Sequence, residues 1–156
     1  MKIYIGIDPG NASGGITILT PEFSEVGYCI RFKDKTNKEL CEEFLTLKEL
    51  VISSKQLHVV LEEVHAFPLQ GVVAAGKFME NYGMLKGFLI ALNIPFRTVR
   101  PQVWQKFYSM HREKTESIPQ WKRRLRQRAQ ELYPELKITN ETADATLIAH
   151  YCLNND

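Results

Sequence analysis

The first part of the chain alternates apolar with other residues, which is typical of β-strands. The alternation runs over residues 3–7, and a second apolar run over residues 15–19 follows at hairpin distance. The turn residues Asp8-Pro9-Gly10 follow the first run directly. A third run over residues 25–31 also reads as a strand. We therefore expect three antiparallel strands joined by tight turns at the start of the fold.

Helical and strand patterns then alternate along the rest of the chain. Residues 36–54 repeat apolar side chains at helical spacing, and residues 58–64 are apolar on both faces, as in a buried strand. A long helix is predicted over 72–93. The remaining predicted elements are a strand over 96–99, a short helix over 101–107, a helix over 117–133 with Ser117 and Gln120 as its capping box, and a final helix from Thr139-Asn140. No repeat or linker interrupts the pattern, so residues 1–156 are expected to form a single domain.

Gly76, Gly83 and Gly87 fall on roughly one face of the predicted long helix. Each glycine inside a helix costs about 1 kcal/mol relative to alanine. Such a stripe indicates close packing, either by another helix of the same chain or by a partner subunit.

Composition limits the class of protein. The chain has 156 residues, of which 44% are hydrophobic and 24% charged, with a formal net charge of +2, as expected for one globular domain. Its three cysteines are far apart and show no CxxC spacing, which favours reduced thiols. No leader-like or membrane-spanning run stands out. A cytoplasmic protein that needs no membrane and no small-molecule cofactor is expected.

Carboxylates stand where several predicted elements end or begin. Asp8 ends the first strand, Glu62 and Glu63 end the buried strand, and Glu141 and Asp144 share a face of the predicted final helix. Like charges gathered in this way need cations to be stable. Oxygen ligands without histidine or cysteine favour Mg²⁺ or Mn²⁺, and a two-metal centre suits phosphoryl transfer. Asp8 could equally start an Asx-turn, and surface acids are common.

A basic run crowds the helix predicted over 117–133. It contains Lys122, Arg123, Arg124, Arg126 and Arg128. Such a run is often only a solvated surface. Beside a site suited to phosphoryl transfer, contact with the phosphates of a nucleic acid becomes the better interpretation, because each neutralised phosphate releases counterions.

Three motifs in this order resemble the RuvC family of Holliday junction resolvases, and the short length resembles its phage-encoded branch. The motifs are Gly6-Ile7-Asp8-Pro9-Gly10 with Gly14-Gly15, Leu61-Glu62-Glu63-Val64, and Glu141-Thr142-Ala143-Asp144-Ala145. The resemblance implies an α/β, RNase H-like fold: a five-stranded mixed sheet, three strands antiparallel and then two parallel, with helices on both faces. It also implies a homodimer that nicks opposed strands of a four-way DNA junction, with two Mg²⁺ ions per active site and Mn²⁺ as a substitute.

Carried over by position, the resemblance makes four acids the metal ligands and catalytic residues: Asp8, Glu62, Glu141 and Asp144. Glu62 is chosen over Glu63 because the family pattern is an aliphatic residue, glutamate, any residue and valine. The family usually has aspartate at position 141.

The resemblance also concerns basic and aromatic residues. The family has a catalytic lysine where this chain has Trp104, whereas Lys122 matches a second family lysine and is expected to be catalytic. The predicted DNA-binding residues are Lys106, Lys122, Arg123, Arg124, Arg126 and Phe67, the last by stacking on an unpaired base.

Three rival functions remain at the level of sequence. A sugar-kinase or actin-like ATPase half also opens with a strand, aspartate and glycines, but needs a second half for which 156 residues leave no room. A non-cleaving DNA-junction binder gains nothing from acids that face phosphates. An RNase H-like nuclease acting on RNA:DNA hybrids would share the same metal chemistry, so only substrate competition separates it.

Overall fold

A five-stranded mixed sheet forms the centre of the protein in a computed structural model, which describes residues 2–21, 27–53, 56–65 and 71–155. The strands are β1 (Lys2–Asp8), β2 (Gly15–Leu19), β3 (Gly27–Arg31), β4 (Gln56–Glu62) and β5 (Arg97–Val99), in the order β3-β2-β1-β4-β5. β1, β2 and β3 are antiparallel neighbours, whereas β4 runs parallel to β1 and β5 parallel to β4. The predicted mixed sheet is confirmed. The first two residues of the strand predicted over 25–31 lie outside the described residues.

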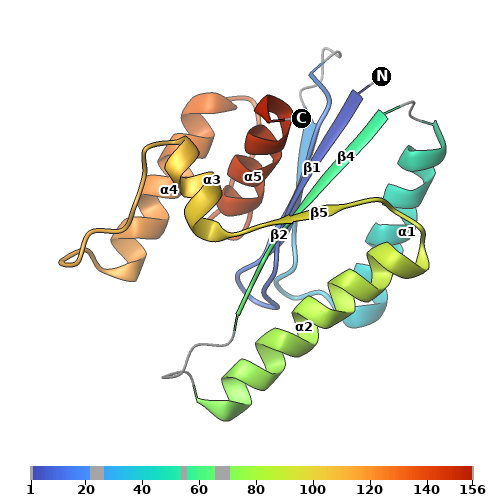
Figure 1. Ribbon diagram of the computed structural model, residues 1–156, viewed down its shortest axis with the longest axis horizontal. Coiled ribbons are helices and arrows are strands. Elements are labelled where there is room, and N and C mark those ends of the chain that lie inside the picture. Colours follow the sequence, from blue (N-terminus) through green and yellow to red (C-terminus); the bar gives the residue numbers. More distant parts are fainter. Residues whose placement is uncertain (1, 22–26, 54–55, 66–70, 156) are drawn as a thin grey trace.

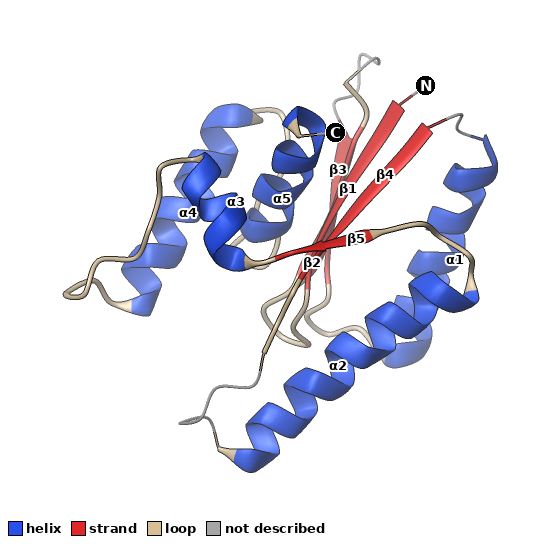
Figure 2. Ribbon diagram, in the orientation of Figure 1, coloured by secondary structure: helices blue, strands red, loops and turns tan. Residues whose placement is uncertain are grey.

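Helices cover both faces of the sheet, as Figures 1 and 2 show. They are α1 (Asn37–Ser53), α2 (Val72–Ala91), α3 (Pro101–Phe107), α4 (Ile118–Leu132) and α5 (Ala143–Asn154). α1 and α2 lie on one face, and α3, α4 and α5 lie on the other. Ser117 and Gln120 form the predicted capping box of α4, through reciprocal bonds between side chains and backbone N–H groups.

The alternation along β1 assigns its side chains to two hydrophobic cores. Ile3, Ile5 and Ile7 pack in the core beneath α1 and α2. Tyr4 packs in the opposite core with residues of α4 and α5, including Leu147. Since successive side chains of a strand point to opposite faces, the carboxylate that ends β1 lies on the α5 side.

α5 lies unusually close to β1 at Gly6. A Cβ atom built on Gly6 would lie 2.1 Å from the carbonyl oxygen of Ala145 and 2.4 Å from the amide nitrogen of Ala149. Only a residue without a side chain fits there. The glycine therefore lets the first turns of α5 lie directly on β1, beside the strand end.

The glycines of α2 have no close neighbour in the described residues. A Cβ atom on Gly76, Gly83 or Gly87 would meet no atom within 4 Å, and all three residues are exposed. Internal packing, one of the two predicted explanations of the stripe, is therefore wrong for the described part of the chain. No helix among the described residues is long and apolar enough to cross a lipid bilayer.

Candidate active site

Three carboxylates from distant parts of the sequence meet at one end of the sheet. Asp8 ends β1 and Glu62 ends β4; these strands pair in parallel with Ile7 opposite Leu61, so their carboxyl ends are neighbours. Asp144 comes from the first turn of α5, which the close approach at β1 brings to the same place. The three acids are 6%, 8% and 5% exposed, respectively. Burying three carboxylates so close together is costly unless the charges are balanced.

The shared burial perturbs the protonation of two of these acids. Desolvation, followed by the charges of Glu62 and Asp144, raises the pKa of Asp8 well above its usual value. Desolvation and the charge of Asp144 also raise the pKa of Glu62, although hydrogen bonds from Trp104 and Asp8 act in the opposite direction. Asp8 and Glu62 thus hold a proton more tightly than isolated carboxyl groups would.

Lys122 is the cation within this cluster. Its Nζ donates a hydrogen bond to Asp144 Oδ2 and forms an ion pair with that carboxylate. Burial acts to lower the pKa of Lys122, but the charges of Asp144, Asp8 and Glu62 outweigh it, and the net shift is upward. The lysine from α4 therefore stays protonated beside the acids. The structure brings together Asp8, Glu62, Asp144 and Lys122 of the predicted catalytic set.

The donor set suits a hard divalent cation. Asp144 Oδ1 is a buried oxygen with no hydrogen-bond partner among the described residues, and the three carboxylates carry more negative charge than one ammonium group balances. Oxygen ligands of this kind are those that Mg²⁺ and Mn²⁺ prefer. No three His, Cys, Asp or Glu side chains within the described ranges stand ready as a ligand group.

The strand pleat separates Glu62 from Glu63, which periodicity alone could not do. Val60, two residues before Glu62, packs in the core on the α5 side, so Glu62 shares the face of Asp8. The carboxylate of Glu63 lies instead beside His65 Nε2 at 3.1 Å and Arg100 Nε at 3.7 Å. The structure thus places Glu63 outside the acid cluster and next to a basic side chain.

Glu141 lies before the final helix rather than on it. α5 begins at Ala143, so the predicted helix start at residues 139–140 is wrong. The segment instead makes a turn, in which the N–H of Ala143 bonds to the carbonyl of Thr139 at 3.0 Å. Hydrogen bonds from Thr139 and the backbone, followed by the charges of Lys33 and Arg31, lower the pKa of Glu141. The charges that act on Glu141 are thus those of basic residues rather than those of the clustered acids, and its role as a ligand stays a prediction.

The predicted DNA-binding residues differ in their surroundings. Arg124 pairs with Glu116 at 2.9 Å and lies over the Trp121 ring. Arg123 and Arg126 are exposed, and neither has an acidic partner among the described residues. Lys106 on α3 is also exposed, whereas Phe67 lies outside the described residues. Within the described part of the chain, the guanidinium groups of Arg123 and Arg126 are therefore free of acidic partners.

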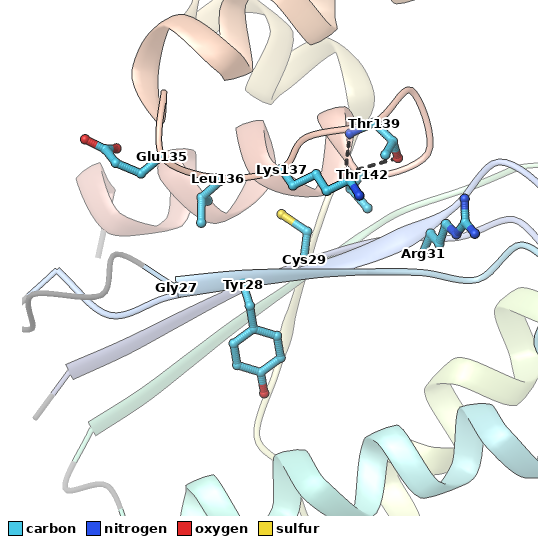
Figure 3. Close-up of a pocket in the computed structure, with 9 residues that line it drawn as sticks. All are labelled: Gly27, Tyr28, Cys29, Arg31, Glu135, Leu136, Lys137, Thr139 and Thr142. Carbon is cyan, nitrogen blue, oxygen red and sulfur yellow. Dashed lines mark hydrogen bonds between the residues drawn. The ribbon is translucent and has the colours of Figure 1, made fainter.

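A pocket of about 470 Å³ lies beside the edge strand β3. Figure 3 shows Cys29 pointing from β3 toward the loop that carries Leu136, while Tyr28 points to the opposite face. Arg31 and Thr142 also line it, but none of the three clustered acids does. This hollow is therefore distinct from the acid cluster.

Two residues outside the predicted site bond either to one of the acids or to the turn beside one. The Trp104 indole Nε1–H donates a hydrogen bond to Glu62 Oε1 at 2.8 Å. The N–H of Gly10, in the turn after Asp8, donates to Asn81 Oδ1 of α2 at 2.8 Å. Asn81 is 2% exposed, and an asparagine inside an apolar helix was the only signal in the sequence. Trp104 was visible only as a departure from an expected lysine.

Comparison with solved structures identifies the fold. The chain resembles Thermus thermophilus RuvC in complex with a Holliday junction substrate, with a TM-score of 0.61 and 16% identity over 96% of this chain and 90% of that chain. It also resembles a second T. thermophilus RuvC structure, with a TM-score of 0.53 and 16% identity over 94% and 90% of the two chains. No family profile matches the sequence, and no curated protein does. The likeness shows the RNase H-like fold of RuvC.

Proposed function

We propose that this protein is a metal-dependent endonuclease that binds four-way and other branched DNA and hydrolyses phosphodiester bonds in paired, opposed strands. The observation that carries this proposal is the cluster of three buried carboxylates, Asp8, Glu62 and Asp144, around the ammonium group of Lys122. A fold gains no stability from such a cluster, because burying unbalanced charge is costly. The RuvC-like fold, seen in a protein bound to a Holliday junction substrate, supports branched DNA as the substrate.

The acids are proposed to hold two Mg²⁺ ions, for which Mn²⁺ can substitute. Asp8, Glu62 and Asp144 would be ligands, and Glu141 would join them by turning away from Arg31 and Lys33. When bound, such ions lower the pKa of water and stabilise the charge of a leaving oxygen. The unpartnered oxygen of Asp144 and the raised pKa of Asp8 support a cation at this place.

The chain's own residues then bind and orient the DNA. Lys122, protonated beside Asp144, is proposed to contact the scissile phosphate and to balance charge that develops there. Arg123, Arg126 and Lys106 are proposed to contact phosphates farther away, since they are exposed. Arg124 is proposed to join them after releasing Glu116. Stacking by Phe67 on an unpaired base stays a prediction.

A homodimer is proposed to pair through α2, because one acid cluster cannot reach two opposed strands at once. An exposed stripe runs along this helix at intervals of three or four residues. It consists of Val72, Gly76, Met79, Gly83, Gly87 and Ile90. Spacings of this kind keep residues on one helix face, and small residues let two helices approach closely.

A cleavage assay with paired variants tests the proposal. Wild-type protein should cut labelled four-way junctions with Mg²⁺ or Mn²⁺ but not in EDTA, and should cut RNA:DNA hybrids poorly. Glu62→Gln should lose cleavage by orders of magnitude and still bind junctions. The matched neighbour Glu63→Gln should stay within about tenfold of wild type, a barrier change near 1.4 kcal/mol.

Each contrary result has a distinct meaning. Cleavage in chelator would overturn the metal mechanism, and preference for hybrids would make the protein a ribonuclease. Junction binding without cleavage in any metal would make it a junction-binding protein. The reverse ranking of Glu62 and Glu63 would contradict the described strand register.

A further inference from the structure

Trp104 is one of the largest fully buried side chains of the protein, with 0% of its surface exposed. It lies on α3 and donates its single polar hydrogen to Glu62 Oε1 at 2.8 Å. The two residues are 42 positions apart in the sequence. The indole ring is thus fully buried, and its N–H is bonded to an acid of the candidate active site.

The backbone fixes this bond from both sides. Glu62 pairs with Val99 across β4 and β5, and the N–H of Glu63 bonds to the carbonyl of Val99 at 2.7 Å. α3 starts at Pro101, separated by one residue from the end of β5, with proline in its first turn. The short strand and the short helix therefore act as one unit that carries Trp104 over Glu62.

The indole ring is also held by its neighbours. Tyr108 lies edge-on to Trp104, with ring centroids 6.4 Å apart, and its hydroxyl donates to the carbonyl of Leu147 in α5 at 2.6 Å. The ring has little freedom to turn, so its N–H points in one direction. The Glu62 carboxylate, which accepts a bond from this fixed N–H, can no longer rotate freely about its terminal C–C bond.

The chemistry of the donor matters as much as its position. An indole N–H is a donor only and stays neutral at all working pH values. It satisfies one oxygen of Glu62 without cancelling the negative charge of the carboxylate. A lysine at this position, which the family resemblance led us to expect, would bring a second ammonium group beside that of Lys122. Among the described residues Lys122 is instead the one cation in the cluster, which leaves more negative charge for metal ions.

We propose that Trp104 is a positioning residue, whose indole N–H fixes the carboxylate of Glu62 toward Asp8 and the metal-binding place. This inference rests on the proposed function, because it concerns the same acid cluster. Hydrogen-bond partners of metal ligands typically contribute 10–100-fold to metal affinity or activity. Loss of the N–H should therefore weaken metal binding and slow cleavage, while contact with the DNA backbone is preserved.

The test compares the two tryptophans of the chain. Trp104→Phe removes the donor and keeps an aromatic ring. Trp121→Phe is the matched control, since Trp121 is 7% exposed and makes no hydrogen bond to an acid among the described residues. Trp104→Phe should lower kcat at least tenfold and raise the Mn²⁺ concentration needed for half-maximal binding, with junction Kd unchanged within about twofold. Trp121→Phe should change kcat less than threefold. Equal effects of the two variants, or an unchanged Mn²⁺ affinity of Trp104→Phe, would overturn the proposal.

A second measurement requires neither cleavage activity nor a substitution of Trp104. In ¹⁵N-labelled protein the indole N–H signal of Trp104 should move on addition of Mg²⁺ and in Glu62→Gln, whereas the signal of Trp121 should move much less. If the Trp104 signal moves neither on addition of Mg²⁺ nor in Glu62→Gln, the positioning role is overturned. This holds even if Trp104→Phe fails to fold. If wild-type protein cuts no DNA but the Trp104 signal responds as expected, the proposed nuclease function fails and the bond to Glu62 stands.

Discussion

Replacing Gly6 by alanine tests how the acid cluster is assembled. The added methyl group would lie 2.1 Å from the carbonyl oxygen of Ala145 and 2.4 Å from the amide nitrogen of Ala149. Both atoms belong to the backbone of α5, so no side-chain rotation can relieve the contact. Since Cβ atoms do not approach other atoms within 3.0 Å, α5 must retreat from β1 by about 1 Å.

Two effects of this retreat can be given a size. Overpacking a core costs about 1–3 kcal/mol, and each kcal/mol lowers the Tm of a chain of this length by about 2–4 °C. We therefore expect Tm to fall by roughly 2–12 °C. The same movement carries Asp144 away from Asp8, and a displacement of about 1 Å in a catalytic group costs on the order of 10²-fold in rate.

Thermal unfolding by circular dichroism and junction cleavage with Mg²⁺ measure both effects. The control is Gly71→Ala, before α2 and outside its exposed stripe, where the new methyl group also meets no atom within 4 Å. Its backbone angles, φ −57° and ψ 138°, suit alanine, so that variant should keep its cleavage rate and lose less stability than Gly6→Ala. If Gly6→Ala has the Tm and the cleavage rate of wild type, α5 does not pack closely on β1. Our explanation of how Asp144 reaches Asp8 would then be wrong as well.

Three further predictions follow from the charges and from α2. Burial and the neighbouring carboxylates raise the pKa of Asp8, so the metal-free fold loses stability as pH rises above the unfolded value of 3.8. Asp8→Asn should therefore raise Tm in EDTA at pH 7–8 but not near pH 3, and a lower Tm at neutral pH would contradict this. Neutralising Arg123 and Arg126 together should reduce the salt dependence of junction affinity by about one unit per lost phosphate contact. Arg124 pairs with Glu116 within the chain, so Arg124→Gln should reduce the salt dependence of junction affinity less. If the double variant keeps the wild-type salt dependence, the basic helix is only a solvated surface. Wild-type protein should sediment as a dimer at micromolar concentration and Gly83→Leu as a monomer; a monomeric wild type, with and without junction DNA, would refute pairing through α2.

The sequence was sufficient for the sheet because its strands have short, local signals. The apolar alternation of residues 3–7 predicts both β1 and the two faces of the sheet, and the turn residues after Asp8 predict the hairpin. The cap of α4 was equally visible, because Ser117 and Gln120 satisfy each other within four residues. These features depend on neighbours along the chain, so periodicity and capping chemistry are enough to find them.

The parts of the site that escaped prediction depend on partners distant in sequence or on competition between local structures. The bond from Trp104 to Glu62 spans 42 positions, and that from Gly10 to Asn81 spans 71. Before α5, the sequence contains three residues that can cap a helix, Thr139, Asn140 and Thr142. The structure has a turn there, closed by the carbonyl of Thr139, and α5 begins only at Ala143. Periodicity could not decide between a turn and a helix there.

The hydrogen bond between Asn81 and Gly10 gives α2 a mechanical role. Asn81 faces inward and accepts a hydrogen bond from the turn that follows Asp8. Gly83, two residues later, faces outward into open space. These positions are only about 3 Å apart along the helix axis. A helix is stiff over so short a length, so a load on its outer surface is transmitted to the turn. If the proposed homodimer forms through α2, the two helices would brace both Asp8 turns at once, and the order of each proposed active site would depend on the partner subunit.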